Sequence, residues 1–264
     1  MAQNPMFNEN AFKRAKAEHQ HGFQQPQDEL TQQPMYLVRA EDTADTSMTL
    51  QGTINKTFFL LFICVVGGML TWNNPQAWTP YIWIIALAAL GIALWTAFKP
   101  TVARFTAPIY AFLEGTLLGA ISAIYNAESN GIVLQAVAIT IAVFFVMLAL
   151  YRFRIIRVTS GLVKVITSAT LAIALFYIGS LILSFFGVNT SYLTSSSPLS
   201  IGISVVVCFV AAFNFLVDFE FINQMISQYA APKYMEWYAG FSLLVTLIWL
   251  YLEILRLLGK AKRR

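Results

Sequence analysis

The sequence predicts an all-α polytopic membrane protein, a bundle of seven transmembrane helices preceded by a polar tail. Three observations predict this fold class. Of the 264 residues, 58% are hydrophobic and only 11% are charged, whereas a soluble domain carries about 25% charged residues. Seven apolar segments each come close to the length of about 20 residues that spans a bilayer. The residues before the first of these segments are polar and rich in glutamine.

Residues 1–50 form the predicted tail. Pro5, Pro26 and Pro34 interrupt any regular pattern within it. A segment this polar buries too little apolar surface to offset the entropy that it would lose on ordering. We therefore predict a mostly disordered cytoplasmic tail over residues 1–50 and a transmembrane domain over residues 51–264.

Each of the seven apolar segments after the tail is predicted to be a spanning helix. In lipid, backbone groups have no water to bond, so a segment has to satisfy its hydrogen bonds internally. Residues 84–94 are continuously apolar, whereas the strands of a membrane barrel alternate in polarity. The connection over residues 218–236 is long enough for a helical extension or a surface helix. The predicted helices cover residues 55–73, 80–98, 105–125, 131–151, 161–186, 198–217 and 237–258.

The distribution of Lys and Arg predicts the orientation in the membrane. Cytoplasmic loops carry an excess of these residues. With a cytoplasmic N-terminus, the first three loops on the opposite side contain neither Lys nor Arg. The cytoplasmic side then holds Lys13, Arg14, Lys16, Arg39, Lys56, Lys99, Arg104, Arg152, Arg154, Arg157, Lys164 and Lys233. We therefore predict that the N-terminus is cytoplasmic.

The C-terminus conflicts with this charge rule. Seven crossings place the basic residues within 260–264 on the outer side, where Lys and Arg are depleted. A re-entrant final segment would return them to the cytoplasmic side, but residues 241–258 contain no Gly or Pro at which the chain would turn. We therefore keep the prediction of seven crossings.

Four acidic residues lie within the predicted helices or at their ends. A charged carboxylate at the bilayer centre costs about 2.5–3.5 kcal/mol on insertion scales, so such a residue usually faces the bundle interior and has a function there. Removal from water also favours the protonated form of a carboxyl group. We therefore predict that these residues sense protons or line an ion pathway: Glu114, Asp218, Glu220 and Glu253.

Each of these acids also has a structural interpretation. Asp218 and Glu220 could be solvated at the cytoplasmic boundary of the bilayer. Glu114 and Glu253 could form hydrogen bonds to neighbouring helices. Glu253 precedes Arg256 by three residues, a spacing at which two side chains on a helix form a local ion pair.

Gly115 and Gly119 directly follow Glu114 with three residues between them. Small residues at this spacing let two helix backbones approach closely in a membrane. The spacing therefore indicates that the face of the third helix near Glu114 packs inward.

The sequence offers little support for a membrane enzyme or a cofactor site. No His lies in any predicted crossing, which excludes bis-His haem and most membrane metal sites. Cys64 and Cys208 lie in apolar runs and are predicted to be buried thiols without a disulfide. We expect no enzymatic activity, no cofactor and no nucleic-acid partner, since the basic residues cluster in short loops as a membrane topology requires.

Three segments together resemble a known family of membrane proteins. Residues 107–123, around Glu114, resemble the third-helix signature of the Bax inhibitor-1/YccA family (the transmembrane BAX inhibitor motif family). Val217-Asp218-Phe219 resembles the family's aspartate motif in helix six. Residues 249–258 resemble the Leu-Tyr-Leu-Asp motif of the last helix, with Glu253 in place of the usual Asp.

The resemblance covers roughly residues 50–260. The tail at residues 4–7 and the run over residues 231–238 are similar to a bacterial branch of the family. We therefore expect a multi-pass protein of the bacterial cytoplasmic (inner) membrane. The resemblance also implies that the last helix is central and wrapped by the other six.

For function, the resemblance implies a pH-sensitive calcium leak channel. Its proton sensor would be an acidic pair between the last two helices, carried over here to Asp218 and Glu253. The same two residues would hold calcium transiently, because carboxylate oxygens are ligands that calcium prefers. Helix length argues against their direct contact: from Trp237 to Glu253 the helix rises about 24 Å, which places Glu253 near the outer face and Asp218 near the inner one.

The resemblance leaves a second functional hypothesis open. The family also includes members that bind and modulate a membrane-bound AAA protease. The chain would then be a membrane interaction protein without transport, and the polar tail would be the contact with the partner. The expected partners are therefore the lipid bilayer, calcium ions and a membrane protease complex.

Overall fold

The computed structural model describes residues 47–187 and 195–263. Most of the tail predicted over residues 1–50 lies outside the described residues. Within the described ranges every regular element is a helix, apart from one isolated bridge between Ser47 and Pro232. The predicted all-α class is therefore confirmed.

Seven helical stretches among the described residues are long and apolar enough to cross a membrane. Each coincides with one predicted segment, so the prediction of seven spanning helices is confirmed. They are α3 (Leu50–Trp72), α5 (Ile82–Phe98) with α4 (Pro75–Trp78) and η1 (Thr79–Tyr81) before it, α6 (Ala103–Glu128) after η2 (Pro100–Val102), α7 (Ile132–Arg152), α8 (Ser160–Phe185), α9 (Pro198–Ser227) and α10 (Met235–Lys262).

Capping side chains explain where several helices begin. The hydroxyl of Thr49 accepts a hydrogen bond from the backbone N–H of Gly52, and α3 therefore begins before the predicted residue 55. Thr159 and Ser197 cap α8 and α9 in the same way. Hydroxyl side chains satisfy backbone donors that have no partner within the first helical turn.

The largest difference from the prediction concerns α9, which continues to Ser227 instead of ending at residue 217. Phe219 and Ile222 are buried and extend the inward face of α9 at helical spacing. Most of the connection predicted over residues 218–236 is therefore helix. As a result, Asp218 lies inside α9 and not at its end.

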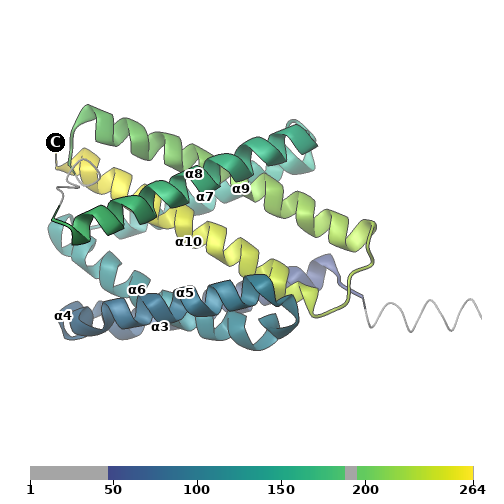
Figure 1. Cartoon of the computed structure of the whole chain (residues 1–264), viewed down its shortest axis with the longest axis horizontal. Helices are drawn as coiled ribbons and strands as arrows, with labels where there is room; N and C mark the ends of the chain where they lie inside the picture. Colours follow the sequence, from purple (N-terminus) through teal and green to yellow (C-terminus); the bar gives the residue numbers. More distant parts are fainter. Residues whose placement is uncertain (1–46, 188–194, 264) are drawn as a thin grey trace, which may run out of the picture. The chain divides into compact units, whose positions relative to one another are not determined.

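The last helix, α10, lies between two groups of helices (Figure 1). On one side α6 packs against α3 and α5, and on the other α9 packs against α7 and α8. The helix α10 contacts α3, α6, α7 and α9, and its side chains belong to both clusters of buried apolar residues. Over much of its length, α10 is therefore surrounded by other helices, and so are its polar side chains.

Glycines allow α3 and α6 to pack backbone to backbone. A β-carbon at Gly115 would overlap the carbonyl of Cys64, and one at Gly119 would overlap the carbonyl of Gly68. The Thr71 hydroxyl donates a hydrogen bond to the Thr116 carbonyl across this contact, at 2.9 Å. The close approach predicted from the glycine spacing is thus confirmed, and α3 is its partner.

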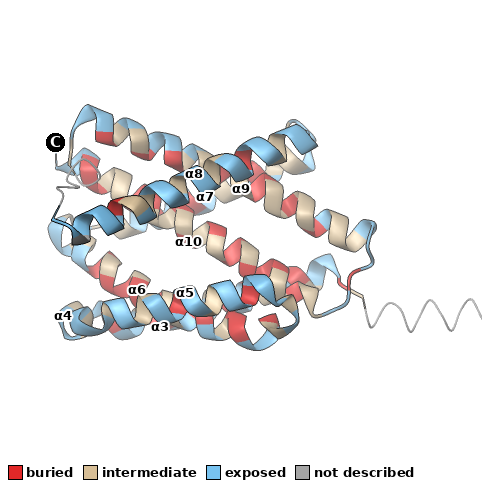
Figure 2. Cartoon of the chain, in the orientation of Figure 1, coloured by how far each residue is buried: buried red, intermediate tan, exposed pale blue. Residues whose placement is uncertain are grey.

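The outward faces of the helices are apolar. Phe58, Leu87, Leu134 and Phe209 are each more than 60% exposed, and exposed residues cover the outer surface of the helices in Figure 2. A soluble monomer rarely exposes contiguous apolar patches larger than a few hundred Å². These faces therefore match the lipid contact expected of a multi-pass membrane protein.

Two contacts show which helix ends share a side. At one side, the backbone N–H of Met48 donates to the Ala231 carbonyl at 2.7 Å, so the start of α3 meets the α9–α10 connection. At the other side, Arg263 after α10 pairs with Glu128 at the end of α6, and this hydrogen bond raises the pKa of the Arg263 guanidinium. Both contacts fit seven alternating crossings without a re-entrant final segment.

We predict that Gly119→Val destabilises the protein by about 1–3 kcal/mol, because added bulk in a packed interface forces backbone shifts. Gly179→Ala is the matched control, since a β-carbon at Gly179 has no atom within 4 Å. Denaturant unfolding in detergent micelles measures both variants. Equal stability of the two variants would contradict the assigned α3–α6 contact.

Candidate functional site

Asp218 binds the neighbouring helix through both of its carboxylate oxygens. On α10, the hydroxyl of Ser242 donates to Oδ1 and that of Thr246 donates to Oδ2, each at 2.6 Å. The two donors are four residues apart and therefore lie on one face of α10. Asp218 thus connects α9 to α10 through hydrogen bonds that depend on its acceptor oxygens.

Glu253 lies in a second polar cluster on α10. It is 1% exposed and forms an ion pair with Arg256 at 2.9 Å. The hydroxyl of Tyr177, from α8, donates to Glu253 at 3.0 Å and accepts from Arg256 at 2.9 Å. The local ion pair considered from the sequence is therefore present, and Tyr177 extends it to a second helix.

Asp218 and Glu253 do not meet. Asp218 binds α10 at Ser242 and Thr246, and Glu253 lies seven residues beyond Thr246 on the same helix. At 1.5 Å per residue, this separation is about 10 Å along the axis. The direct pair that the family resemblance implies is therefore not formed in this structure, as the helix-length argument predicts, although α9 places Asp218 deeper than its predicted end.

Glu220 belongs to a different surface of α9. The hydroxyl of Tyr151, at the end of α7, donates to its Oε2, and the Gln224 side chain donates to its Oε1, both at 2.9 Å. Glu220 also lines a cleft that contains arginines from the α7–α8 connection. It is therefore held near the basic side of the protein, apart from the hydroxyls that bind Asp218.

Glu114 lies in the middle of α6 and is partly buried. Among the described residues it forms neither a hydrogen bond nor an ion pair, and it interacts electrostatically with Cys64 of α3 and Tyr110 of its own helix. The structure therefore places Glu114 at the α3–α6 interface, as the glycine spacing indicates.

Glu236 is a further acid, buried like Glu253, which the sequence interpretation placed in a connection and did not select. It is 2% exposed, and its Oε1 accepts from the backbone N–H of Thr49 at 3.0 Å and from the Thr49 hydroxyl at 2.9 Å. A carboxylate at a helix N-terminus is stabilised by the helix dipole. Glu236, in the first turn of α10, therefore anchors the start of α3.

Lys260 is a buried cation that was also missed. It is 4% exposed, and its ammonium donates to the Ser200 carbonyl at 3.3 Å and to the Ser204 hydroxyl at 2.7 Å. The signal for it was available, because Thr246, Glu253 and Lys260 are seven residues apart in succession. Residues at this spacing lie on nearly one face of a helix.

A polar stripe therefore runs along one face of α10, and we define it as Ser242, Thr246, Glu253 and Lys260. Its partners are Asp218, Ser200 and Ser204 of α9 and Tyr177 of α8. Protonation of either carboxylate would change hydrogen bonds that link α10 to a neighbouring helix. Within the described residues, no three His, Cys, Asp or Glu side chains lie together as a metal site, and Cys64 and Cys208 are free thiols.

A family model described as Bax inhibitor 1 like matches residues 4–263. The match spans nearly the whole chain, so the chain belongs to the Bax inhibitor 1 like family, as its motifs indicated. This is a family of membrane proteins that is not known for enzymatic activity. No curated protein is similar enough to the chain to count as a match.

We predict that Arg256→Gln destabilises the protein by about 3–5 kcal/mol, because it leaves the Glu253 carboxylate buried without a counter-charge. The double variant Glu253→Gln with Arg256→Gln should recover part of this loss in a double-mutant cycle of unfolding free energies. Arg263→Gln is the control, because the exposed pair with Glu128 should contribute at most about 1 kcal/mol. If the changes in unfolding free energy of the two single variants simply added up in the double variant, the assigned ion pair would be contradicted.

We also predict that Glu236→Ala costs about 1–2 kcal/mol, since it removes the two hydrogen bonds at Thr49. Glu236→Gln keeps a carbonyl acceptor and should cost less. Hydrogen exchange reads out the contact locally: the backbone amides of residues 50–53 should exchange faster in Glu236→Ala alone. Unchanged exchange there would show that Glu236 does not anchor α3.

Proposed function

We propose that this member of the Bax inhibitor 1 like family is a pH-sensitive calcium leak channel that opens when intramembrane carboxylates are protonated. The observation that supports this proposal is the polar stripe of α10, which binds the half-buried Asp218 and contains the buried Glu253, at two depths of the bundle. Charged groups at such depth are costly and usually belong to ion pathways or proton relays.

Asp218 is the proposed proton sensor. Its ionised carboxylate accepts two hydroxyl hydrogen bonds from α10, and bonds to a charged acceptor are about twice as strong as neutral ones. Protonation removes this charge and weakens the connection between α9 and α10. The balance then shifts toward a state in which the two helices are less tightly joined, which we assign as open.

The cluster at Glu253 is the proposed barrier of the closed state. Arg256 neutralises Glu253, and Lys260 adds a second positive charge one to two turns further along α10. Both cations repel calcium in this arrangement. Separation of Glu253 from Arg256 would expose carboxylate oxygens, which are the ligands that calcium prefers.

The proposed setting is the bacterial inner membrane, with the N-terminus and the arginine-rich α7–α8 connection on the cytoplasmic side. The Lys and Arg bias of the loops supports this orientation. In it, Asp218 lies in the cytoplasmic half of the bundle and Glu253 in the outer half. The proton sensor would therefore respond to the cytoplasmic side.

We predict that calcium flux through the wild-type protein in liposomes rises as the pH falls. Asp218→Asn should conduct at neutral pH at the level that the wild type reaches in acid, and should lose its pH dependence, because an amide cannot ionise. Ser242→Ala with Thr246→Val should raise flux at neutral pH, since it removes the donors while keeping the carboxylate.

Glu128→Gln is the matched control for this experiment. Glu128 is 48% exposed and pairs with Arg263 at the end of α6, so its neutralisation should leave the pH profile unchanged. Glu253→Gln tests the proposed barrier and should alter the size of the flux. The same flux in the wild type, Asp218→Asn and Glu253→Gln would sink the channel proposal.

The alternative function, modulation of a membrane-bound AAA protease without transport, assigns the binding of the partner to the polar N-terminal tail. Met48 and Thr49 form hydrogen bonds with Ala231 and Glu236, which fix the start of α3 against the α9–α10 connection. Deletion of residues 1–46 separates the two functions. Loss of partner binding with unchanged flux would favour the interaction function for the tail.

A further inference from the structure

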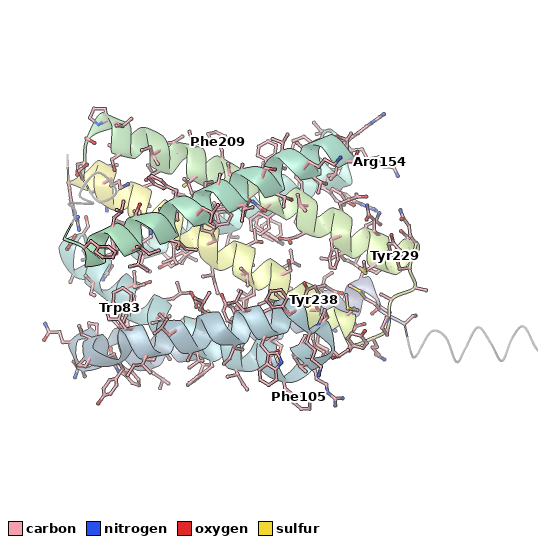
Figure 3. All side chains as sticks on the ribbon, viewed as in Figure 1. Trp83, Phe105, Arg154, Phe209, Tyr229 and Tyr238 are labelled. Atoms are coloured by element: carbon pink, nitrogen blue, oxygen red, sulfur yellow. The ribbon has the colours of Figure 1, made fainter. Side chains whose placement is uncertain are left out.

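A positively charged cleft lies where α7 ends, at some distance from the polar stripe of α10. It is about 540 Å³ in volume and opens between the α7–α8 connection and the last turns of α9. Arg154, at its rim, points outward at the same end of the bundle as Tyr229 of the α9–α10 connection (Figure 3). The polar residues that line it are Tyr151, Arg152, Arg154, Arg157, Glu220 and Asn223.

Hydrogen bonds to α7 fix the backbone of this connection. The N–H groups of Ile155 and Ile156 both donate to the Leu150 carbonyl, at 3.0 and 3.4 Å. Arg154 adopts φ 53°, a left-handed conformation that a β-carbon disfavours. Ile156 and Val158 pack against the buried apolar cluster. The arginines are therefore presented by an ordered turn with a strained residue, and such strain concentrates at functional positions.

The charges of the cleft are unbalanced. Among the described residues, Arg152, Arg154 and Arg157 form no ion pair, and all three are exposed. The one carboxylate, Glu220, is occupied by hydrogen bonds from Tyr151 and Gln224. The topology rule explains why basic residues lie in this connection, but it does not require three of them to line one cleft.

The residues between the arginines are apolar. Phe153 is 75% exposed and Ile155 is 67% exposed, so basic and large apolar side chains alternate at the C-terminal end of α7 and in the turn that follows it. An arginine guanidinium matches the oxygens of a phosphate group in a bidentate manner. The apolar side chains match acyl chains, which a free phosphate ion would not supply.

We propose that this cleft binds the headgroup phosphate of an anionic phospholipid from the leaflet at the ends of α7 and α9. Arg152, Arg154 and Arg157 hold the phosphate, and the Asn223 side chain adds a neutral donor. Phe153 and Ile155 contact the acyl chains of the same lipid. This site is independent of the proposed channel function, since the described residues that line the cleft include neither Asp218 nor any member of the polar stripe.

The test uses the full chain in nanodiscs that contain equal amounts of phosphatidylcholine and phosphatidylglycerol. After extraction into detergent, native mass spectrometry counts the retained lipids. The wild type should retain phosphatidylglycerol preferentially. Since each basic residue near an anionic surface contributes about fivefold to binding, Arg152→Gln with Arg154→Gln and Arg157→Gln should lower retention by about 100-fold.

A matched control removes the same charge elsewhere on the same predicted side: Lys99→Gln with Arg104→Gln and Lys164→Gln. It should retain phosphatidylglycerol like the wild type. If both triple variants lost the same amount of phosphatidylglycerol, the attraction would be general to the basic surface and the site would be overturned. If both retained as much phosphatidylglycerol as the wild type, the site would also be overturned. Retention of phosphatidylcholine to the same extent as phosphatidylglycerol would also overturn it.

A single substitution separates binding from folding. Glycine adopts positive φ without strain, so Arg154→Gly should unfold at a temperature no lower than that of the wild type and should still retain several-fold less phosphatidylglycerol. Unreduced retention in this folded variant would refute the role of Arg154. Added inorganic phosphate should not displace the lipid at millimolar concentration, and full displacement would show a free-phosphate site instead.

Discussion

The structure depends on one constraint: polar groups on α10 are buried in a bundle and each must find its partner on another helix. An unpaired charge in hydrocarbon is expensive, so the position of each group determines which helices have to be its neighbours. Ser242 and Thr246 require Asp218 of α9. Glu253 accepts a hydrogen bond from Tyr177 and thereby joins α8 to α10. The partners of α10 thus define the arrangement of one side of the bundle.

On the other side of the bundle, close packing between helix backbones holds α3 and α6 together. Between α3 and α6, Gly115 and Gly119 bring two backbones into contact, because apolar helices in lipid gain little from a hydrophobic effect and rely on close packing. Glu236 of α10 then connects to this pair through Thr49, the N-cap of α3. The helix α10 is consequently joined to both groups by hydrogen bonds, to α9 and α8 through the polar stripe and to α3 through the Glu236 carboxylate.

The sequence predicts the spanning helices well because lipid imposes simple rules on length and polarity. The predicted end of the sixth helix at residue 217 is wrong, because α9 continues past it. The sequence becomes more polar there, but Phe219 and Ile222 keep the inward face of the helix apolar. Average hydropathy does not detect one apolar face. Burial of Glu236 could not be predicted from its position near a helix end, since its partner Thr49 lies far away in the sequence. Tertiary contacts decide that case, and local patterns do not encode them. Lys260, in contrast, continues the seven-residue spacing of Thr246 and Glu253.

The separation of Asp218 from Glu253 has a consequence for the proposed mechanism. Carboxylates that share a proton titrate as a pair, but Glu253 lies about 10 Å along α10 from Thr246, which binds Asp218. The two carboxylates therefore have to communicate through α10. Thr246, which binds Asp218, and Glu253 lie on nearly the same face of α10, two turns apart. A small rotation or shift of α10 after protonation of Asp218 would therefore act directly on the Glu253–Arg256 pair. In this mechanism α10 itself carries the signal. The chain has Glu253 where the family motif usually has Asp, and this difference keeps the property that the proposed barrier needs. That property is a carboxylate that reaches both Tyr177 and Arg256.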